Sequence, residues 1–156
     1  MPSSDSQSGK PSVSLFFPVY NDGHVIEELV READAILAEL TSRYEIIAIN
    51  DASKDNSGEI ADRLAAEIPN FRVIHHSTNK GYGAALSTGF QATGSMDWIC
   101  FTDGDHQYDI SELRRFMKHL DHYDVIIGNR VAKSYGPFRK FLSFGMNGLV
   151  RLLFHT

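Results

Sequence analysis

Two aspartates separated by one glycine form the most chemically suggestive pair in this sequence. Asp103 and Asp105 flank Gly104 directly after an apolar segment, residues 98–102. Side chains two residues apart in extended backbone point to the same side, so both carboxylates can reach one cation. Carboxylate oxygens suit Mg²⁺ or Mn²⁺ bound to phosphate, and such a cation stabilises a diphosphate leaving group. A solvated acidic loop is the alternative interpretation.

Polar residues also follow the other apolar segments of the chain. They are residues 18–22, 50–51, 79–81 and 129–130. If each apolar segment is a strand of one parallel sheet, these residues line the rim where such sheets bind ligands. Asp51 taken alone is more typical of a turn or a helix cap, and Arg130 offers a bidentate phosphate contact. Together these residues predict a site for a phosphorylated ligand.

The elements that must position this rim alternate along the chain. Apolar segments predict strands at residues 13–17, 44–50, 71–75, 98–102 and 125–127. Helical spacing of apolar residues predicts helices at 25–40, 58–68, 82–92, from a Ser111 cap to about 120, and at 138–154. This alternation predicts an α/β fold with a mostly parallel sheet flanked by helices on both faces. Residues 1–12 are expected to form a disordered leader.

Composition limits the class of protein. The chain has 156 residues, of which 42% are hydrophobic and 22% charged, as in one soluble globular domain. A net charge of -5 argues against nucleic acid as a partner. The single cysteine excludes a disulfide framework and favours a reducing, cytoplasmic setting. That residue, Cys100, lies in an apolar segment and is expected to be buried. No apolar run is long enough to cross a membrane.

The ordered combination of motifs resembles inverting family 2 glycosyltransferases of the GT-A type, nearest the dolichyl- or polyprenyl-phosphate sugar transferases. The motifs that carry the resemblance are residues 18–21, 50–55, 79–85, 103–107 and 128–130. The resemblance implies a Rossmann-like GT-A fold. It also implies transfer of a sugar from a GDP- or UDP-linked donor to a polyprenyl or dolichyl phosphate.

The resemblance further implies a role for each matching residue. Nucleotide-sugar binding falls to Pro18, Tyr20, Asp22, Asp51, Lys80 and Asp103, metal binding to Asp103, Asp105 and Gln107, catalysis to Asp105 and Arg130, and acceptor phosphate binding to Arg130, Arg139 and Ser143. The implied metal is Mg²⁺ or Mn²⁺. Two positions depart from the family pattern: Asp22 replaces the usual glutamate, and Asn50 replaces the first of two adjacent aspartates.

Residues 138–156 mix aromatic and aliphatic side chains with Arg139, Lys140 and Arg151. This pattern is typical of a helix at a membrane surface, and a core-packing helix explains it equally well. We expect an acceptor-side helix after a core at residues 13–137, with peripheral contact at the cytoplasmic membrane face and a homodimer. Since family members continue beyond the position of Thr156, we expect the acceptor side to be truncated.

Several alternatives stay open. No general base follows Arg130, which favours an anionic phosphate acceptor over a saccharide hydroxyl, although a base could lie in the truncated part. A non-catalytic nucleotide-sugar or metal-binding module would keep the same rim residues. A phosphatase with an aspartyl nucleophile would carry its Asp-x-Asp motif after the first strand. A sugar nucleotidyltransferase would need a glycine-rich basic loop near the first strand, which is missing here.

Overall fold

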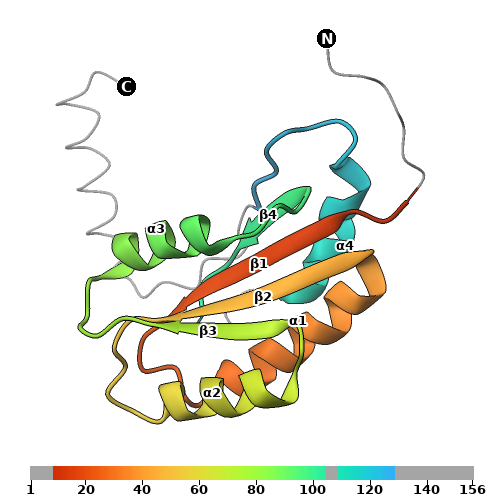
Figure 1. Ribbon diagram of the computed structural model, residues 1–156. Helices are drawn as coiled ribbons and strands as arrows, with labels where there is room; N and C mark the ends of the chain where they lie inside the picture. Colours follow the sequence, from red (N-terminus) through yellow and green to blue (C-terminus); the bar gives the residue numbers. More distant parts are fainter. Residues whose placement is uncertain (1–8, 105–108, 129–156) are drawn as a thin grey trace, which may run out of the picture. The chain divides into compact units, whose positions relative to one another are not determined.

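A computed structural model of the chain describes residues 9–104 and 109–128 (Figure 1). Residues up to Asp121 form one compact unit, and a second unit begins at His122. The first unit holds a parallel sheet of β1 (Ser12–Val19), β2 (Arg43–Asn50), β3 (Phe71–His75) and β4 (Trp98–Phe101), in the order β3-β2-β1-β4. Its long helices are α1 (Ile26–Leu40), α2 (Ser57–Glu67) and α3 (Tyr82–Ala92).

The helices cover both faces of the sheet: α3 lies on one face, and α1 and α2 lie on the other (Figure 1). Alternate residues of β1 therefore enter different cores. Leu15 and Phe17 pack with the α1 and α2 side chains, whereas Phe16 packs with Ile47 of β2 and Ala85 of α3. Because both faces are buried, the central strands read as continuous apolar runs.

The larger core explains why the helices form where they do. In α1, Leu29, Val30, Ala33 and Leu37 recur at helical spacing and are buried. The exposed sides of α1 and α2 are joined by a ring of ion pairs, in which Arg31 and Arg63 each contact Glu27 and Glu67. Exposed pairs of this kind contribute little, so the apolar stripe is the main stabilising feature.

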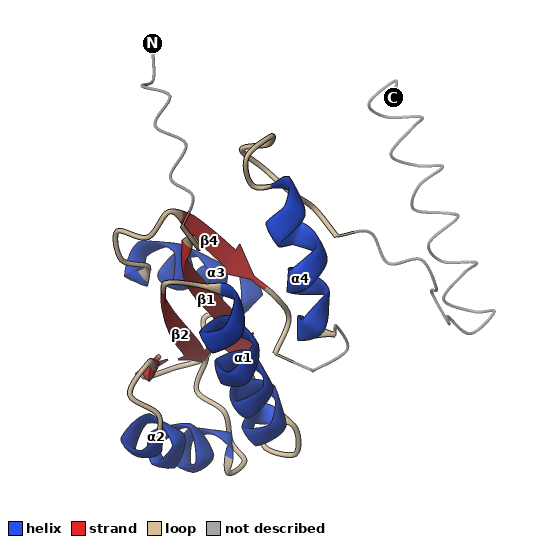
Figure 2. Cartoon of the chain, turned by 90° about the vertical axis from the view of Figure 1, so that its right-hand side faces the viewer, coloured by secondary structure: helices blue, strands red, loops and turns tan. Residues whose placement is uncertain are grey.

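The short segment after the acidic loop packs beside α1 (Figure 2). It consists of a 3₁₀ turn (Ile110–Glu112), α4 (Leu113–Phe116) and a second 3₁₀ turn (Met117–His119). Ile110 and Leu113 are buried in the larger core. The predicted cap at Ser111 is wrong. The Asp109 carboxylate accepts a hydrogen bond from the Ser111 N–H, at 2.8 Å, so the segment begins two residues earlier.

Two strand predictions also need correction. The first strand continues through Pro18 to Val19. Strand β4 pairs only with residues 13–16 of β1, so among the described residues β1 has no strand partner on that side at Pro18. A strand edge of this kind tolerates proline. The predicted strand at 125–127 is not a strand. Val125 and Ile127 are 72% and 83% exposed, and the described residues supply no ladder partner for them.

The remaining predicted elements agree with the structure to within a residue or two at each end. Cys100 is partly buried and packs against the larger core. Within the described ranges, no helix is both long and apolar enough to cross a membrane. The predicted helix at 138–154 and residues 1–8 of the predicted leader lie outside the described residues. The predicted end of the leader at residue 12 is wrong, because Ser12 is buried and is the first residue of β1.

Candidate functional site

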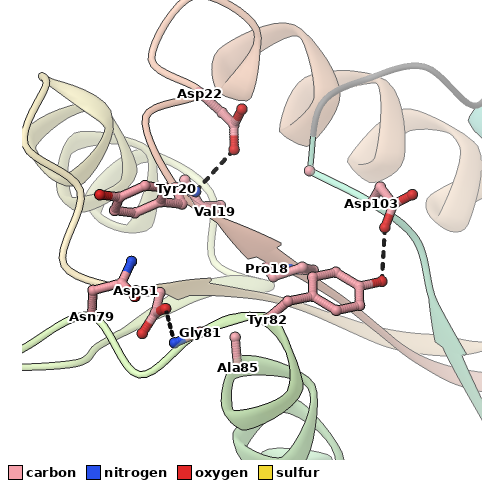
Figure 3. Close-up of a pocket in the computed structure, with 11 residues that line it drawn as sticks. Pro18, Val19, Tyr20, Asp22, Asp51, Asn79, Gly81, Tyr82, Ala85 and Asp103 are labelled. Atoms are coloured by element: carbon pink, nitrogen blue, oxygen red, sulfur yellow. Dashed lines mark hydrogen bonds between the residues drawn. The ribbon is translucent and has the colours of Figure 1, made fainter. Parts of the chain in front are cut away.

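A pocket opens at the carboxyl ends of the strands, where the chain order reverses between β1 and its neighbours β2 and β4 (Figure 3). Its volume is about 390 Å³. The lining residues come from the end of β1, the start of α3 and the loops after the four strands: Pro18, Val19, Tyr20, Asp22, Asp51, Asn79, Gly81, Tyr82, Ala85, Asp103 and Gly104. This is the edge at which open α/β sheets bind ligands.

The loop after β1 is held rigidly against the loop after β2. Asn21 has a φ of 62°, a left-handed conformation that asparagine tolerates. Its amide N–H donates to Ser53 Oγ at 3.1 Å, and its side-chain oxygen accepts from the Lys54 N–H at 2.8 Å. Asp22 Oδ2 accepts from the Tyr20 N–H at 2.9 Å. These bonds set the position of Tyr20 at the pocket wall.

Asp51 is buried in the pocket lining, and both of its carboxylate oxygens accept hydrogen bonds from the protein. Its Oδ1 accepts from the Lys80 N–H at 2.9 Å, and its Oδ2 accepts from the Gly81 N–H at 2.8 Å. Gly81 has a φ of 86°, which favours glycine at this point. Burial opposes the charged form of Asp51, but the bonds from Lys80, His76 and Gly81 outweigh it and hold the pKa of this carboxyl below its ordinary value.

His76 links Asp51 to α3. Its Nδ1 lies 2.6 Å from Asp51 Oδ1, and its Nε2 lies 2.9 Å from Thr88 Oγ1. The neighbouring histidine, His75, bonds to Asn50 and Asp62 instead. Asn50, at the position where the family usually has aspartate, is therefore turned to support the loop and is not part of the pocket lining.

Asp103 lies across the pocket from Asp51 (Figure 3). Its Oδ1 accepts a hydrogen bond from the Tyr82 hydroxyl at 2.8 Å. The next residue, Gly104, is buried against β1: a Cβ atom here would lie 2.1 Å from the Pro18 carbonyl oxygen. Only glycine allows the loop after β4 to pass this close to β1, and this close passage fixes where Asp103 enters the pocket.

The pocket is acidic. Asp22, Asp51 and Asp103 line it, and the described lining residues include no lysine or arginine. A diphosphate alone would be repelled by this wall, whereas a divalent cation would neutralise both partners. The carboxylate oxygens of Asp103 and Asp22 are the donor type that Mg²⁺ and Mn²⁺ take, so the residues present fit such an ion. The described ranges hold no cluster of three or more potential metal ligands.

Five predicted site residues, Pro18, Tyr20, Asp22, Asp51 and Asp103, are brought together in this pocket. Lys80 is adjacent but contributes its backbone N–H to Asp51, and it does not line the pocket. The predicted residues Asp105, Gln107, Arg130, Arg139 and Ser143 lie outside the described residues.

Two residues with a place in the site were not assigned a role from the sequence. Tyr82 directly follows residues 79–81 and its hydroxyl bonds to Asp103. Its position as an aromatic residue next to these rim residues, at the start of a predicted helix, is the sequence feature that could have indicated a role. His76 directly follows β3, as the other rim residues follow their strands. Its pairing with Asp51 was invisible because the two are 25 residues apart.

A parallel sheet covered by helices on both faces, with a pocket at its switch point, is an α/β domain of the GT-A type. The family model described as "Glycosyl transferase family 2" matches residues 14–154, so the chain belongs to this family. It is 33% identical over 142 residues to an undecaprenyl-phosphate 4-deoxy-4-formamido-L-arabinose transferase of Edwardsiella ictaluri, covering 89% of this chain and 43% of that protein. It is 31% identical to a dolichyl-phosphate beta-glucosyltransferase of Trichomonas vaginalis, covering 90% of this chain and 47% of that protein.

Solved structures share the fold. A mannosyltransferase of Pyrobaculum calidifontis, in complex with GDP-Man and Mn²⁺, aligns with a TM-score of 0.58 at 20% identity, over 67% of this chain and 30% of that one. A glucosyl-3-phosphoglycerate synthase of Mycobacterium tuberculosis, in complex with Mn²⁺, UDP and glucosyl-3-phosphoglycerate, aligns with a TM-score of 0.55 at 22% identity, over 73% and 41%. The GT-A fold and the family expected from the sequence are confirmed. The chain spans less than half the length of the curated relatives it matches.

Proposed function

We propose that this chain is the donor-binding core of an inverting glycosyltransferase that moves a sugar from a GDP- or UDP-linked donor to a polyprenyl or dolichyl phosphate. The observation that carries the proposal is the pocket itself. It places the buried carboxylate of Asp51 on one side and the carboxylate of Asp103 on the other, at the edge where α/β sheets bind nucleotides. Membership of family 2 supports the same chemistry.

The Asp51 side of the pocket suits the nucleotide base. A buried carboxylate held in its charged form accepts hydrogen bonds and donates none. It therefore favours a base that offers a ring N–H, as uracil and guanine do. Tyr20 is 44% exposed at the same end of the pocket and offers an aromatic face to the base.

The Asp103 side suits the ribose and the diphosphate. A divalent cation held by Asp103, together with Asp105 and Gln107, would stabilise the nucleoside diphosphate as it leaves. Arg130 would contact phosphate as a bidentate donor. The acidic pocket wall supports the assignment of this cation, because the described lining residues offer a diphosphate no positive side chain.

The acceptor proposal relies on the relatives and on the last part of the chain. Both curated relatives above are named for polyprenyl- or dolichyl-phosphate acceptors. A phosphate acceptor is anionic near neutral pH and can attack in line with the anomeric carbon without a general base. We assign Arg139 and Ser143 to this phosphate. Peripheral contact with the cytoplasmic membrane face and a homodimer are further parts of the proposal.

Calorimetric titration tests the donor site without an acceptor. Purified protein is titrated with UDP and with GDP, each with Mn²⁺ and with EDTA. We expect one nucleotide to bind in Mn²⁺ and its affinity to fall at least about tenfold in EDTA, the effect of losing a charge-assisted contact. Asp103→Asn should bind weakly in both conditions. Asp62→Asn, on the exposed surface of α2, is the matched control and should bind as the parent does.

Two results would contradict the proposal. The absence of binding by either nucleotide would remove the donor site. Full affinity for Asp103→Asn in Mn²⁺ would remove Asp103 from it. Nucleotide binding without sugar transfer to a polyprenyl phosphate, in a protein that includes the acceptor-side residues, would favour the non-catalytic module.

A further inference from the structure

We propose that His76 is a positioning residue of this pocket, which orients the Asp51 carboxylate through a buried hydrogen-bonded chain that ends on Thr88 of α3. The inference deepens the proposed function and rests on it, because the pocket that His76 organises is the donor pocket. His76 does not line the pocket. It acts on a bound ligand only through Asp51 and the loop that follows β3.

The contacts define the direction of the chain. The side chains of His76 and Asp51 are 4% and 5% exposed, so neither can exchange its partner for water. A charged carboxylate only accepts hydrogen bonds, so the hydrogen in the 2.6 Å contact belongs to His76 Nδ1. The other ring nitrogen, Nε2, lies 2.9 Å from the Thr88 hydroxyl, which can donate to or accept from it.

His76 also determines which oxygen of Asp51 can receive a ligand. A carboxylate has about four acceptor sites, two on each oxygen. Oδ1 already accepts from His76 and from the Lys80 N–H, whereas Oδ2 accepts from the Gly81 N–H. Among these contacts the remaining acceptor site belongs to Oδ2. A ring N–H of a base entering the pocket therefore meets a defined atom, and loss of the His76 bond lets the carboxylate rotate.

The same bonds hold the chain segment from His76 to Gly81, which forms part of the pocket wall. This segment is attached to Asp51 at both ends, by His76 at its start and by the amides of Lys80 and Gly81 at its end. Asn79, which lines the pocket, lies between the two attachments. Removing one attachment would loosen Asn79 as well as Asp51, and both changes weaken contact with the base.

The experiment compares His76→Leu with His76→Asn. Leucine fills a similar volume but cannot donate, whereas the asparagine amide can place an N–H near the position of Nδ1. Both variants are titrated with UDP and GDP in Mn²⁺, and with pyrophosphate in Mn²⁺ as a ligand without a base. We expect nucleotide affinity to fall about tenfold or more in His76→Leu, the cost of a hydrogen bond to a charged group. His76→Asn should stay within about threefold of the parent.

The pyrophosphate measurement separates positioning from a general loosening of the fold. Pyrophosphate affinity should be equal in the parent and both variants, because His76 acts on the base side. His75→Leu is the matched control. His75 is adjacent in sequence, 39% exposed on its side chain and bonded to Asp62 and Asn50, neither of which lines the pocket, so its replacement should leave both affinities unchanged.

Three results would overturn the positioning role. They are parent-like nucleotide affinity in His76→Leu, failure of His76→Asn to restore affinity, and an equal loss for pyrophosphate. Should His76→Leu fail to fold, Thr88→Val removes the hydroxyl at the end of the chain at nearly constant volume. A severalfold loss of nucleotide affinity then supports the proposal, and unchanged affinity overturns it. A parent protein that binds neither nucleotide would instead overturn the proposed function.

Discussion

The Tyr82 hydroxyl donates a 2.8 Å hydrogen bond to Oδ1 of Asp103, joining the first residue of α3 to the loop after β4. The bond joins two parts of the fold that pack in different places. Strand β4 pairs with β1 at the edge of the sheet, whereas α3 packs over β1 and β2. The carboxylate proposed for the ribose and the metal is therefore held by an aromatic residue from the opposite wall.

Replacing Tyr82 with phenylalanine should weaken nucleotide binding in Mn²⁺ about fivefold, because Asp103 loses the donor that fixes its rotamer. Thermal unfolding should change little, since Tyr82 is 55% exposed. Titration calorimetry measures the first effect and circular dichroism the second. Tyr44→Phe is the matched control: it removes a 2.7 Å bond to Asp34 on α1 and should cost about 1 kcal/mol of stability without affecting nucleotide affinity. Parent-like affinity of Tyr82→Phe would contradict the role of this bond.

Gly104→Ala should destabilise the protein by about 1–3 kcal/mol, because the new Cβ would collide with the Pro18 carbonyl. Gly83→Ala provides the comparison. Gly83 lies in α3, and a Cβ there meets nothing within 4 Å, so alanine should be neutral or stabilising by up to about 1 kcal/mol. Urea unfolding of both variants tests the pair, and equal stabilities would show that the close approach at Gly104 is unimportant.

Asp51→Asn should lower the free energy of unfolding by about 1–3 kcal/mol at pH 7, since an amide cannot accept from all three donors. The pKa of Asp51 is lowered in the folded protein, so its contribution is complete above the unfolded pKa and is lost as the pH falls through the lower folded value. The stability difference between parent and variant should therefore shrink below about pH 4. A difference that stays constant down to pH 2 would argue against a charged Asp51.

Cys100 should react slowly with iodoacetamide in the folded protein. Burial raises the pKa of its thiol to about 11, and only the thiolate reacts. The folded state holds this proton more tightly than the unfolded state, so the free energy of unfolding should fall as the pH rises from about 9 to about 11. Cys100→Ala should have a flatter alkaline limb. Alkylation at pH 8 as fast as in urea would contradict the burial.

Much of the scaffold could be predicted because its signals are local. The third strand and the helix at 82–92 agree with the structure in their bounds, since apolar periodicity and flanking turns mark both. Burial of β1 and β2 on two faces produces the continuous apolar runs that indicate a parallel sheet. The rim residues were predictable as a group, because polar residues that end parallel strands must meet at one edge.

Other features depended on which segments become neighbours. The predicted strand at 125–127 had the right composition, but a strand exists only where a partner supplies its hydrogen bonds, and the described residues supply none. Pro18 suggested the end of the first strand, yet β1 continues past it. The pairing with β4 stops at residue 16, so the proline interrupts no hydrogen bond with β4 on that side.

The sequence by itself determined the order of elements, the amphipathic helices and the set of polar residues at the strand ends, because each follows from the preference of nearby residues for burial, turns or water. Only the tertiary structure decided the partners within that set. Asp51 meets His76 and Gly81 from 25 and 30 residues away, and Tyr82 meets Asp103 from 21. These contacts require the sheet order β3-β2-β1-β4, which brings together chain segments whose separation no local pattern records.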